Sequence, residues 1–296
     1  MQNQIKNKLV MVTGATSGIG KEAAKMLASD GARVIIVGRN QEKCQQTVKE
    51  IITETKNKNL EYLLADFQYL GEIRLLAEKF HTKYDKLDVL INNAGVYLKR
   101  RETTADGREL SFSVNYLAPF FLTNLLLPAL KKSDSARIIN VSSLSHLGAK
   151  IDFDDIFSEK SNQHPKFAYR RSKLALIMFT YELARQLKNS NITVNAVCPG
   201  GVATALWKTN NDLQTKATRL IVPLLKTPQQ AAGLLVYLAE SPEANNISGK
   251  FFALKKHSRF RNYNYKNTIS KSSPESYILP DQKKLWQVSK ELVGFG

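Results

Sequence analysis

The chain turns at Thr13-Gly14-Ala15-Thr16-Ser17-Gly18-Ile19-Gly20, between two segments of different character. The residues before it, Lys8-Leu9-Val10-Met11-Val12, form an apolar run typical of a strand, and residues 21–28 are good helix formers. Glycines let a backbone approach phosphate groups closely, and free helix N–H groups favour negative charge. The spacing is G-x-x-x-G-x-G rather than the commoner G-x-G-x-x-G, but its strand-to-helix context favours nucleotide binding over a purely structural turn.

Strand-like apolar runs recur along the whole chain. They lie at residues 9–12, 33–37, 60–65, 87–91, 137–141, 192–197 and 249–254. Helix-like segments lie between most of them, and several runs are continuously apolar, as strands buried on both faces are. This alternation predicts an α/β fold: a single Rossmann-like, doubly wound parallel sheet with helices on both faces.

We expect one nucleotide-binding domain over residues 1–296, with three additions. Residues 144–168 form an irregular, partly acidic insert, residues 205–226 form an apolar loop suited to covering a substrate, and residues 255–296 form a C-terminal extension. Long functional loops of this kind often act as lids. Another helix is expected to begin at Thr227-Pro228-Gln229-Gln230, with Thr227 as its N-cap and Gln230 completing a capping box.

The second strand ends at Gly38-Arg39-Asn40, about 20 residues beyond the glycine turn. An NAD-selective site places an Asp or Glu there to accept a hydrogen bond from the ribose 2′-hydroxyl. No carboxylate is present, and the guanidinium of Arg39 is well shaped to bind a 2′-phosphate. We therefore predict NADP(H) in preference to NAD(H), with a solvated loop arginine as the alternative.

Tyr169 and Lys173 lie four residues apart at the start of an apolar helical run, so both side chains lie on one helix face. A free tyrosine has a pKa of about 10, and a nearby cation is expected to lower it. Such a pair can move a proton to or from an alcohol or carbonyl oxygen. The spacing alone also occurs by chance, and its weight comes from the glycine turn.

Together these residues resemble the short-chain dehydrogenase/reductase family, in its retinol dehydrogenase-like branch. The resemblance covers nearly the whole chain and rests on short motifs in a fixed order. These are the glycine turn, Asp66 with Phe67 beside it, Asn92-Asn93-Ala94-Gly95, Asn115, Ser143, Tyr169 with Lys173, and Pro199-Gly200 with Val202 and Thr204. Two features match the branch: the stretched interval 144–168 and the tail segment Leu285-Trp286-Gln287-Val288-Ser289.

The resemblance implies a role for each residue. Ser143 would hold the substrate oxygen and Tyr169 would transfer the proton. Lys173 would lower the pKa of the phenol and hold the nicotinamide ribose, and Asn115 would fix a water that links Lys173 to solvent. The remaining residues would bind the coenzyme: Gly14, Thr16, Ser17, Gly18, Ile19, Gly20, Arg39, Asp66, Phe67, Asn93, Ala94, Gly95, Pro199, Gly200, Val202 and Thr204.

The implied function is an NADP(H)-dependent oxidoreductase that interconverts a lipophilic alcohol and its aldehyde or ketone. Retinoids are one candidate substrate, by resemblance only. A double-bond reductase on the same fold and a non-catalytic NADP(H) sensor remain alternatives, as does a surface-binding protein that uses the basic tail. Presence of Ser143, Tyr169 and Lys173 favours an enzyme over a sensor.

Each residue also has an ordinary structural explanation. Asp66 could cap the helix that begins near Leu70, Asn92 and Asn93 could form a turn, and Ser143 could cap a strand end. Asn115 could satisfy a backbone group, and Thr204 could be an N-cap. Their joint order favours a site, because ligands of open parallel sheets bind at the carboxyl ends of the strands.

Composition fits a globular enzyme, with 43% hydrophobic residues in 296. Cys44 and Cys198 are far apart and outside any redox or metal spacing, which fits a reducing compartment. The four histidines form no ligand pattern, so no metal is expected. The first residues are polar, and no uninterrupted apolar run reaches membrane-spanning length, so we expect a cytoplasmic protein.

The net charge is +17, and the basic residues are dispersed along the chain, with local density at 99–101 and 255–266. No basic stripe with interleaved aromatics lies in the core sequence, so we expect no nucleic-acid partner. The excess can serve an anionic coenzyme, and the segment 255–266 is more simply a solvated tail. Weak peripheral membrane contact is a minor hypothesis. Homo-oligomer formation, through helices near residues 107–130 and 169–188, is also open.

Overall fold

The computed structural model describes residues 4–159, 164–202, 226–254 and 268–295. Its centre is an eight-stranded sheet with the order β3-β2-β1-β4-β5-β6-β7-β8. The strands are β1 (Leu9–Thr13), β2 (Arg33–Gly38), β3 (Leu60–Leu64), β4 (Val89–Asn92), β5 (Ala136–Val141), β6 (Ile192–Cys198), β7 (Lys250–Ala253) and β8 (Ile269–Ser270). The seven predicted strands are confirmed, each within about two residues at either end.

The predicted parallel sheet is confirmed for the first seven strands, and β8 is an antiparallel addition at the edge. The sequence did not predict β8, because a strand of two residues carries no periodic signal. Its partner is β7, where Phe252 pairs with Ile269. The described part of the C-terminal extension therefore starts with a strand that pairs with the sheet.

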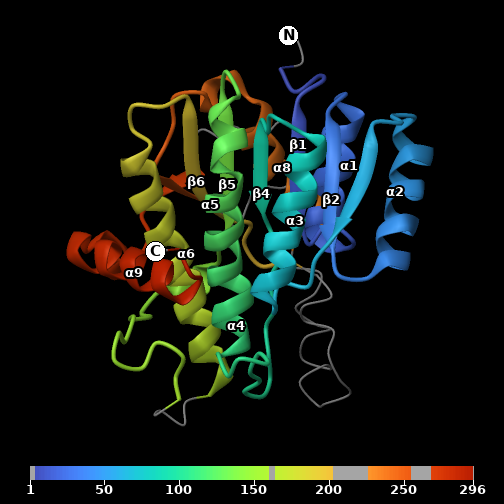
Figure 1. The fold of residues 1–296 in the computed structure, drawn as a ribbon. Helices are drawn as coiled ribbons and strands as arrows, with labels where there is room; N and C mark the ends of the chain where they lie inside the picture. Colours follow the sequence, from blue (N-terminus) through green and yellow to red (C-terminus); the bar gives the residue numbers. More distant parts are fainter. Residues whose placement is uncertain (1–3, 160–163, 203–225, 255–267, 296) are drawn as a thin grey trace.

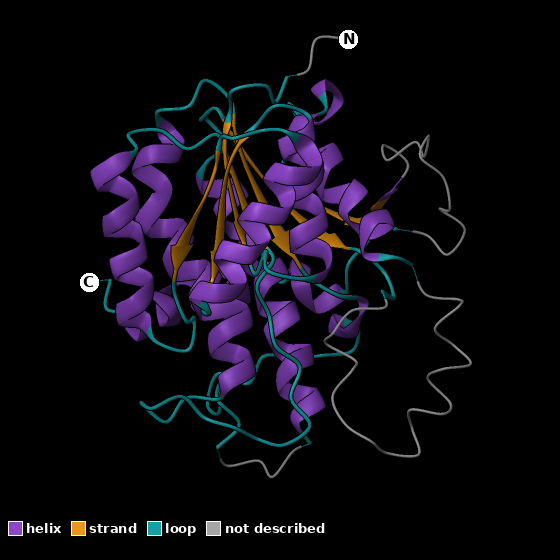
Figure 2. Cartoon of the chain, turned by 90° about the vertical axis from the view of Figure 1, so that its right-hand side faces the viewer, coloured by secondary structure: helices purple, strands orange, loops and turns teal. Residues whose placement is uncertain are grey.

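Helices cover both faces of the sheet, as predicted (Figures 1 and 2). One layer contains α1 (Gly18–Ser29), α2 (Gln41–Thr55) and α8 (Pro228–Glu240). The other contains α3 (Leu70–Lys83), the short α4 (Leu110–Phe112), α5 (Ala118–Lys131) and α6 (Pro165–Gln186). The last helix, α9 (Leu279–Leu292), packs against α6.

Alternating side chains of the buried strands supply the two halves of the core. In β1, Met11 packs with the α3–α5–α6 layer, whereas Val10 and Val12 pack with the α1–α2–α8 layer. In β2, Ile35 and Ile36 divide in the same way. A strand with helices on both sides needs apolar residues at consecutive positions, which explains the continuous apolar runs of the sequence.

Local sequence signals set two of the helix ends. Helix α1 ends at Ser29 with Asp30 as its C-cap, and Gly31 follows with a φ of +87°, a conformation that favours glycine. Helix α8 begins after Thr227, whose side chain accepts from the Gln230 backbone while Gln230 bonds back to the Thr227 backbone. This confirms the predicted capping box.

Helix α9 attaches the tail to the core through the segment that the sequence singled out. Leu285 is buried in the core, and the ring of Trp286 stacks on Phe179 with centroids 5.8 Å apart. The hydroxyl of Ser289 bonds the hydroxyl of Tyr116 at 2.6 Å. The Leu-Trp-x-x-Ser spacing therefore places a packing face and a polar contact on the same side of one helix.

Among the described residues, one helical run, Leu110–Lys131, is long and apolar enough to cross a membrane by length and composition. Of its most apolar window, 78% is buried inside the protein. The run spans α4, a π-helical turn (Ser113–Leu117) and α5, and it packs against β4, β5, α3 and α6. Core helices of soluble proteins pass the same test, so the run is weak support for a membrane span.

Candidate active site

A cleft of about 570 Å³ opens at the carboxyl ends of the strands. The chain order reverses between β1 and β4, the position in an open α/β sheet where ligands bind. Residues that directly follow β1, β2, β3, β4, β5 and β6 all line it. The predicted site residues that line the cleft are Gly14, Thr16, Ser17, Gly18, Ile19, Arg39, Asp66, Phe67, Asn93, Ala94, Gly95, Ser143, Tyr169, Lys173, Pro199, Gly200 and Val202.

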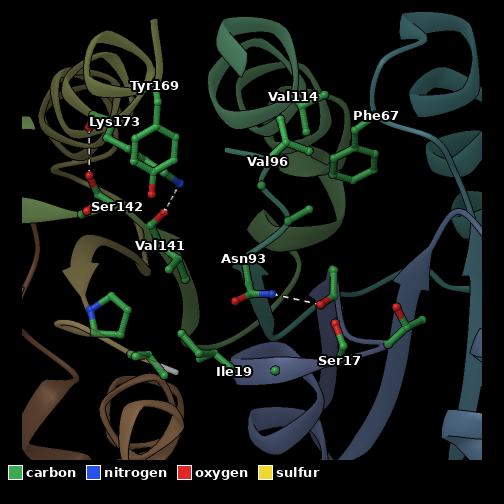
Figure 3. A pocket seen from close by; sticks show the side chains of 18 of the residues that line it. Ser17, Ile19, Phe67, Asn93, Val96, Val114, Val141, Ser142, Tyr169 and Lys173 are labelled. Carbon is green, nitrogen blue, oxygen red and sulfur yellow. Dashed lines mark hydrogen bonds between the residues drawn. The ribbon is translucent and has the colours of Figure 1, made fainter. Parts of the chain in front are cut away.

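Asn93 holds the glycine turn in place. Its side-chain amide donates to the carbonyl oxygens of Thr13 at 2.8 Å and Gly14 at 3.1 Å. Figure 3 shows Asn93 pointing toward the turn. Gly20 does not line the cleft but lies behind the turn, where an added Cβ would be 2.4 Å from Asn93 Nδ2 and 2.6 Å from Gly14 O. Asn93 is therefore more than a turn former, because it fixes the shape of the loop.

The turn leaves room and hydrogen-bond donors for an anionic group. Gly14 and Gly18 adopt positive φ angles of +64° and +58°, which bring backbone rather than side chain toward the cleft. Ser17 is the N-cap of α1, but its side chain makes no capping hydrogen bond. The first N–H groups of α1 therefore have no side-chain acceptor there, as a pyrophosphate site requires.

Arg39 and Asp66 lie at the far end of the cleft, after β2 and β3. The side chain of Arg39 is 72% exposed, and its Nη1 lies 3.8 Å from the Asp66 carboxylate. Asp66 also accepts from the backbone N–H of Gln68 at 3.2 Å and from its side-chain amide at 2.8 Å. The N-cap of α3 is Tyr69, so the alternative reading of Asp66 as that N-cap is wrong.

Tyr169, Lys173 and Ser143 meet at the opposite end of the cleft (Figure 3 shows Tyr169 and Lys173). Lys173 Nζ lies 5.7 Å from the Tyr169 ring centroid and donates to the carbonyl of Val141 at 2.9 Å. Ser142 donates to the backbone carbonyl of Lys173 at 2.9 Å, which ties α6 to the end of β5. The i, i+4 spacing thus places both functional side chains over the strand end.

The expected fall in the pKa of Tyr169 is not found. Burial raises the pKa of Tyr169 to about 12, although a hydrogen bond with Ser143 opposes the rise. Burial also lowers the pKa of Lys173 to about 8. Attraction between the ammonium and a phenolate would lower the pKa of Tyr169, but the desolvation of both groups is the larger effect in this enclosed site.

Asn115 lies behind the cleft, in the buried π-helical turn between α4 and α5. Its side chain accepts from the N–H of Val96 at 2.7 Å and donates to the Val96 carbonyl at 3.0 Å. Asn115 therefore satisfies backbone groups of Val96, which is the structural role that the sequence allowed for it. An added Cβ on Gly95 would lie 3.1 Å from Asn115 Oδ1 and 3.5 Å from Lys173 Nζ, so both polar groups face the same small space.

Several lining residues were not identified from the sequence. They are Val37, Gly38, Ala65, Gln68, Val96, Leu110, Val114, Val141, Ser142, Leu144, Ser145 and Gly201. Many are small or apolar and carry no chemical signature, although their places beside predicted site residues were a usable signal. Cys198 also lines the cleft and is buried.

Apolar side chains that line the cleft include Val96, Leu110, Val114 and Leu144. Val96 and Val114 lie next to Phe67 in Figure 3. At the other end, the ring of Tyr97 meets the ring of Tyr169 edge to face at 5.0 Å. Thr204 and nearly all of the predicted covering loop, 205–226, lie outside the described residues, as do residues 255–267 of the extension.

Known proteins resemble this chain along most of its length. Residues 14–254 match a family described as enoyl-(acyl carrier protein) reductase. Retinol dehydrogenase 13 of Homo sapiens is 40% identical over 296 residues, covering 98% of this chain and 86% of that protein. Polyprenol dehydrogenase of Homo sapiens is 40% identical over 295 residues, covering 97% of this chain and 86% of that protein.

One solved structure with the same fold contains a bound coenzyme. It is described as a short chain dehydrogenase from Escherichia coli CFT073 complexed with NADPH. The two chains are 29% identical with a TM-score of 0.67, covering 86% of this chain and 98% of the other.

Proposed function

This chain belongs to the short-chain dehydrogenase/reductase family, and we propose that it is an NADP(H)-dependent oxidoreductase that interconverts a lipophilic alcohol and its aldehyde or ketone. Its relationship to retinol dehydrogenases makes alcohol–carbonyl interconversion the reaction class. The observation that carries the proposal is the convergence of Tyr169, Lys173 and Ser143 with the glycine turn in one cleft.

The coenzyme fits the residues of the cleft. The glycine turn and the uncapped start of α1 are suited to the pyrophosphate, and the exposed guanidinium of Arg39 is suited to a 2′-phosphate. When bound, the nicotinamide supplies or accepts the hydride. Lys173, Pro199, Gly200 and Val202 line the end of the cleft where its ring and ribose would be held.

The proton chemistry belongs to the protein. Because the pKa of Tyr169 is raised, its phenol carries a proton at neutral pH and can donate it to a carbonyl oxygen that is being reduced. Ser143 would donate a hydrogen bond to the same oxygen, where negative charge develops. Lys173 stabilises the phenolate that remains. Asn115 would act from behind, by fixing the Val96 backbone and a water near Lys173.

Replacing Tyr169 by Phe tests the proposal directly. We expect Tyr169→Phe to lower kcat with an aldehyde or ketone by at least about a hundredfold, because general acid catalysis typically contributes that much. Binding of NADPH, measured by fluorescence titration, should stay within about twofold. Tyr62→Phe is a matched control, since that hydroxyl lies on β3 and bonds only the surface residue Gln45 among the described partners. Near-normal turnover of Tyr169→Phe would refute the assignment.

A double-bond reductase is the second candidate, and the description of the matching family favours it. The substrate panel should therefore contain an α,β-unsaturated aldehyde together with its saturated aldehyde. Formation of the unsaturated alcohol supports carbonyl reduction, whereas formation of the saturated aldehyde supports the alternative. NADPH binding without any turnover across the panel would instead favour a sensor.

Four features stay predictions: a single domain over 1–296 with its insert and extension, a cytoplasmic location, weak membrane contact and homo-oligomer formation.

A further inference from the structure

A buried histidine that the proposed reaction does not use lies next to the site. His146 ends the short 3-10 turn Leu144–His146, which begins directly after Ser143. Its side chain is 0% exposed, and its ring meets the ring of Phe251 on β7 at 5.1 Å, edge to face. Burial also keeps the pKa of His146 below its ordinary value.

Two hydrogen bonds fix the ring of His146. Its Nδ1 lies 2.6 Å from the carbonyl oxygen of Ser143, which also accepts from the His146 backbone N–H at 3.2 Å. Its Nε2 lies 3.0 Å from the backbone nitrogen of Ser273. A carbonyl only accepts and an amide N–H only donates, so Nδ1 carries the proton and Nε2 carries none.

Ser273 belongs to the C-terminal extension. It precedes the 3-10 turn Pro274–Tyr277, which leads into α9. The neighbouring Ser272 bonds the hydroxyl of Tyr181 on α6, the helix that also carries Tyr169 and Lys173, at 2.7 Å. The extension therefore contacts α6, which carries Tyr169 and Lys173, directly, and it contacts the segment that carries Ser143 through His146.

We propose that His146 is a positioning residue: its neutral ring couples the C-terminal extension to the backbone of Ser143 and so aims the Ser143 hydroxyl at the substrate oxygen. The proposal rests on the proposed function. Ser143 has an extended backbone (φ −152°, ψ 153°). The two hydrogen bonds that its carbonyl oxygen accepts from His146 hold that conformation. The hydroxyl must be placed within a fraction of an ångström for transition-state stabilisation.

Two substitutions separate the two hydrogen bonds. His146→Asn keeps a donor where Nδ1 was, toward Ser143, and His146→Gln keeps an acceptor where Nε2 was, toward Ser273. We expect the Gln variant to lose roughly tenfold or more in kcat and the Asn variant to lose less, with the KM for NADPH unchanged in both. Equal kcat losses, or losses that follow thermal stability alone, would overturn the positioning role.

The extension supplies a second pair of variants. Ser273→Pro removes the backbone donor, and the φ of −64° at Ser273 already suits proline. Ser273→Ala keeps that donor, and the buried hydroxyl that it removes has no hydrogen-bond partner among the described residues. We expect a lower kcat for the Pro variant and parent kcat for the Ala variant, whereas equal kcat in both would contradict the coupling.

The ring can also be observed without turnover. Nitrogen-15 NMR of histidine-labelled protein should show an Nδ1–H tautomer that does not titrate near pH 6.5. An Nε2–H tautomer, or a ring that titrates there, would overturn the inference even if the enzyme is active. An inactive parent chain across the carbonyl panel refutes the proposed function and the positioning role of His146 with it. An active parent with equal Asn and Gln variants refutes the role of His146 alone.

Discussion

Arg39 is the residue on which the predicted coenzyme preference depends. The absence of a carboxylate after β2 indicates NADP(H), and the structure places the guanidinium at the cleft with 72% of its side chain exposed. Its contact with Asp66, at 3.8 Å, is a weak surface ion pair that a 2′-phosphate can replace. The proposed preference for NADP(H) thus depends on a single exposed side chain.

Arg39→Asp should reverse that preference. We expect the KM for NADPH to rise by roughly tenfold to a hundredfold, because a charge-assisted hydrogen bond is lost. The KM for NADH should fall. Lys49→Asp makes the same charge change at an exposed position of α2 and should leave the ratio unaltered. An unchanged ratio of the two KM values in Arg39→Asp would count against the role of this arginine.

The raised pKa of Tyr169 predicts different pH profiles for the two directions. Since the phenol stays protonated well below about 12, carbonyl reduction should show no titration of Tyr169 between pH 6 and 9. Alcohol oxidation needs the phenolate, so its kcat should increase with pH over this range, by up to about tenfold per unit. Initial rates in both directions, at saturating coenzyme, measure this. A flat oxidation profile would show that Tyr169 is not the base.

At the level of elements, α9 explains a tail motif whose purpose the sequence did not reveal. Leu285 and Trp286 pack into the α5–α6 layer, and Ser289 bonds Tyr116, the residue after Asn115. The helix thus supports two elements that carry site residues, α6 and the π-helical turn. Packing contacts of this kind are made by residues far apart in the chain, which periodicity within a segment does not detect.

Leu285→Ala measures how firmly α9 is attached. The side chain is 1% exposed in the core, so its truncation should lower the free energy of unfolding by about 3 kcal/mol. Gln287→Ala, on the exposed side of the same helix, should change it by less than about 0.5 kcal/mol. Urea unfolding with a constant m value gives both numbers. A loss below about 1 kcal/mol for Leu285→Ala would mean that α9 contributes little to the core.

For the whole molecule, the sheet order is what gathers the site. Residues that follow six different strands reach one cleft because parallel strands end at the same edge and the order reverses beside β1. A ligand in that cleft contacts both halves of the sheet. Its binding should therefore stabilise the entire fold rather than a single loop.

Thermal unfolding with each coenzyme tests this at the level of the fold. NADPH at about a hundred times its Kd should add about 2.7 kcal/mol, which corresponds to a rise of several degrees in Tm. NADH at the same concentration should raise Tm by less, because it has no 2′-phosphate for Arg39. Identical shifts with both coenzymes would contradict the predicted preference, and no shift with either would contradict nucleotide binding.

The sequence by itself determined the alternation of seven strands with helices, the glycine turn, the order of the site residues and the capping box at Thr227, because each is a local pattern of residue types. Only the tertiary structure decided that desolvation raises the pKa of Tyr169, that Asn93 holds the glycine turn and that His146 joins Ser143 to the tail. Desolvation and hydrogen bonds between distant residues depend on which surfaces meet when the chain folds, and no stretch of sequence contains that information alone.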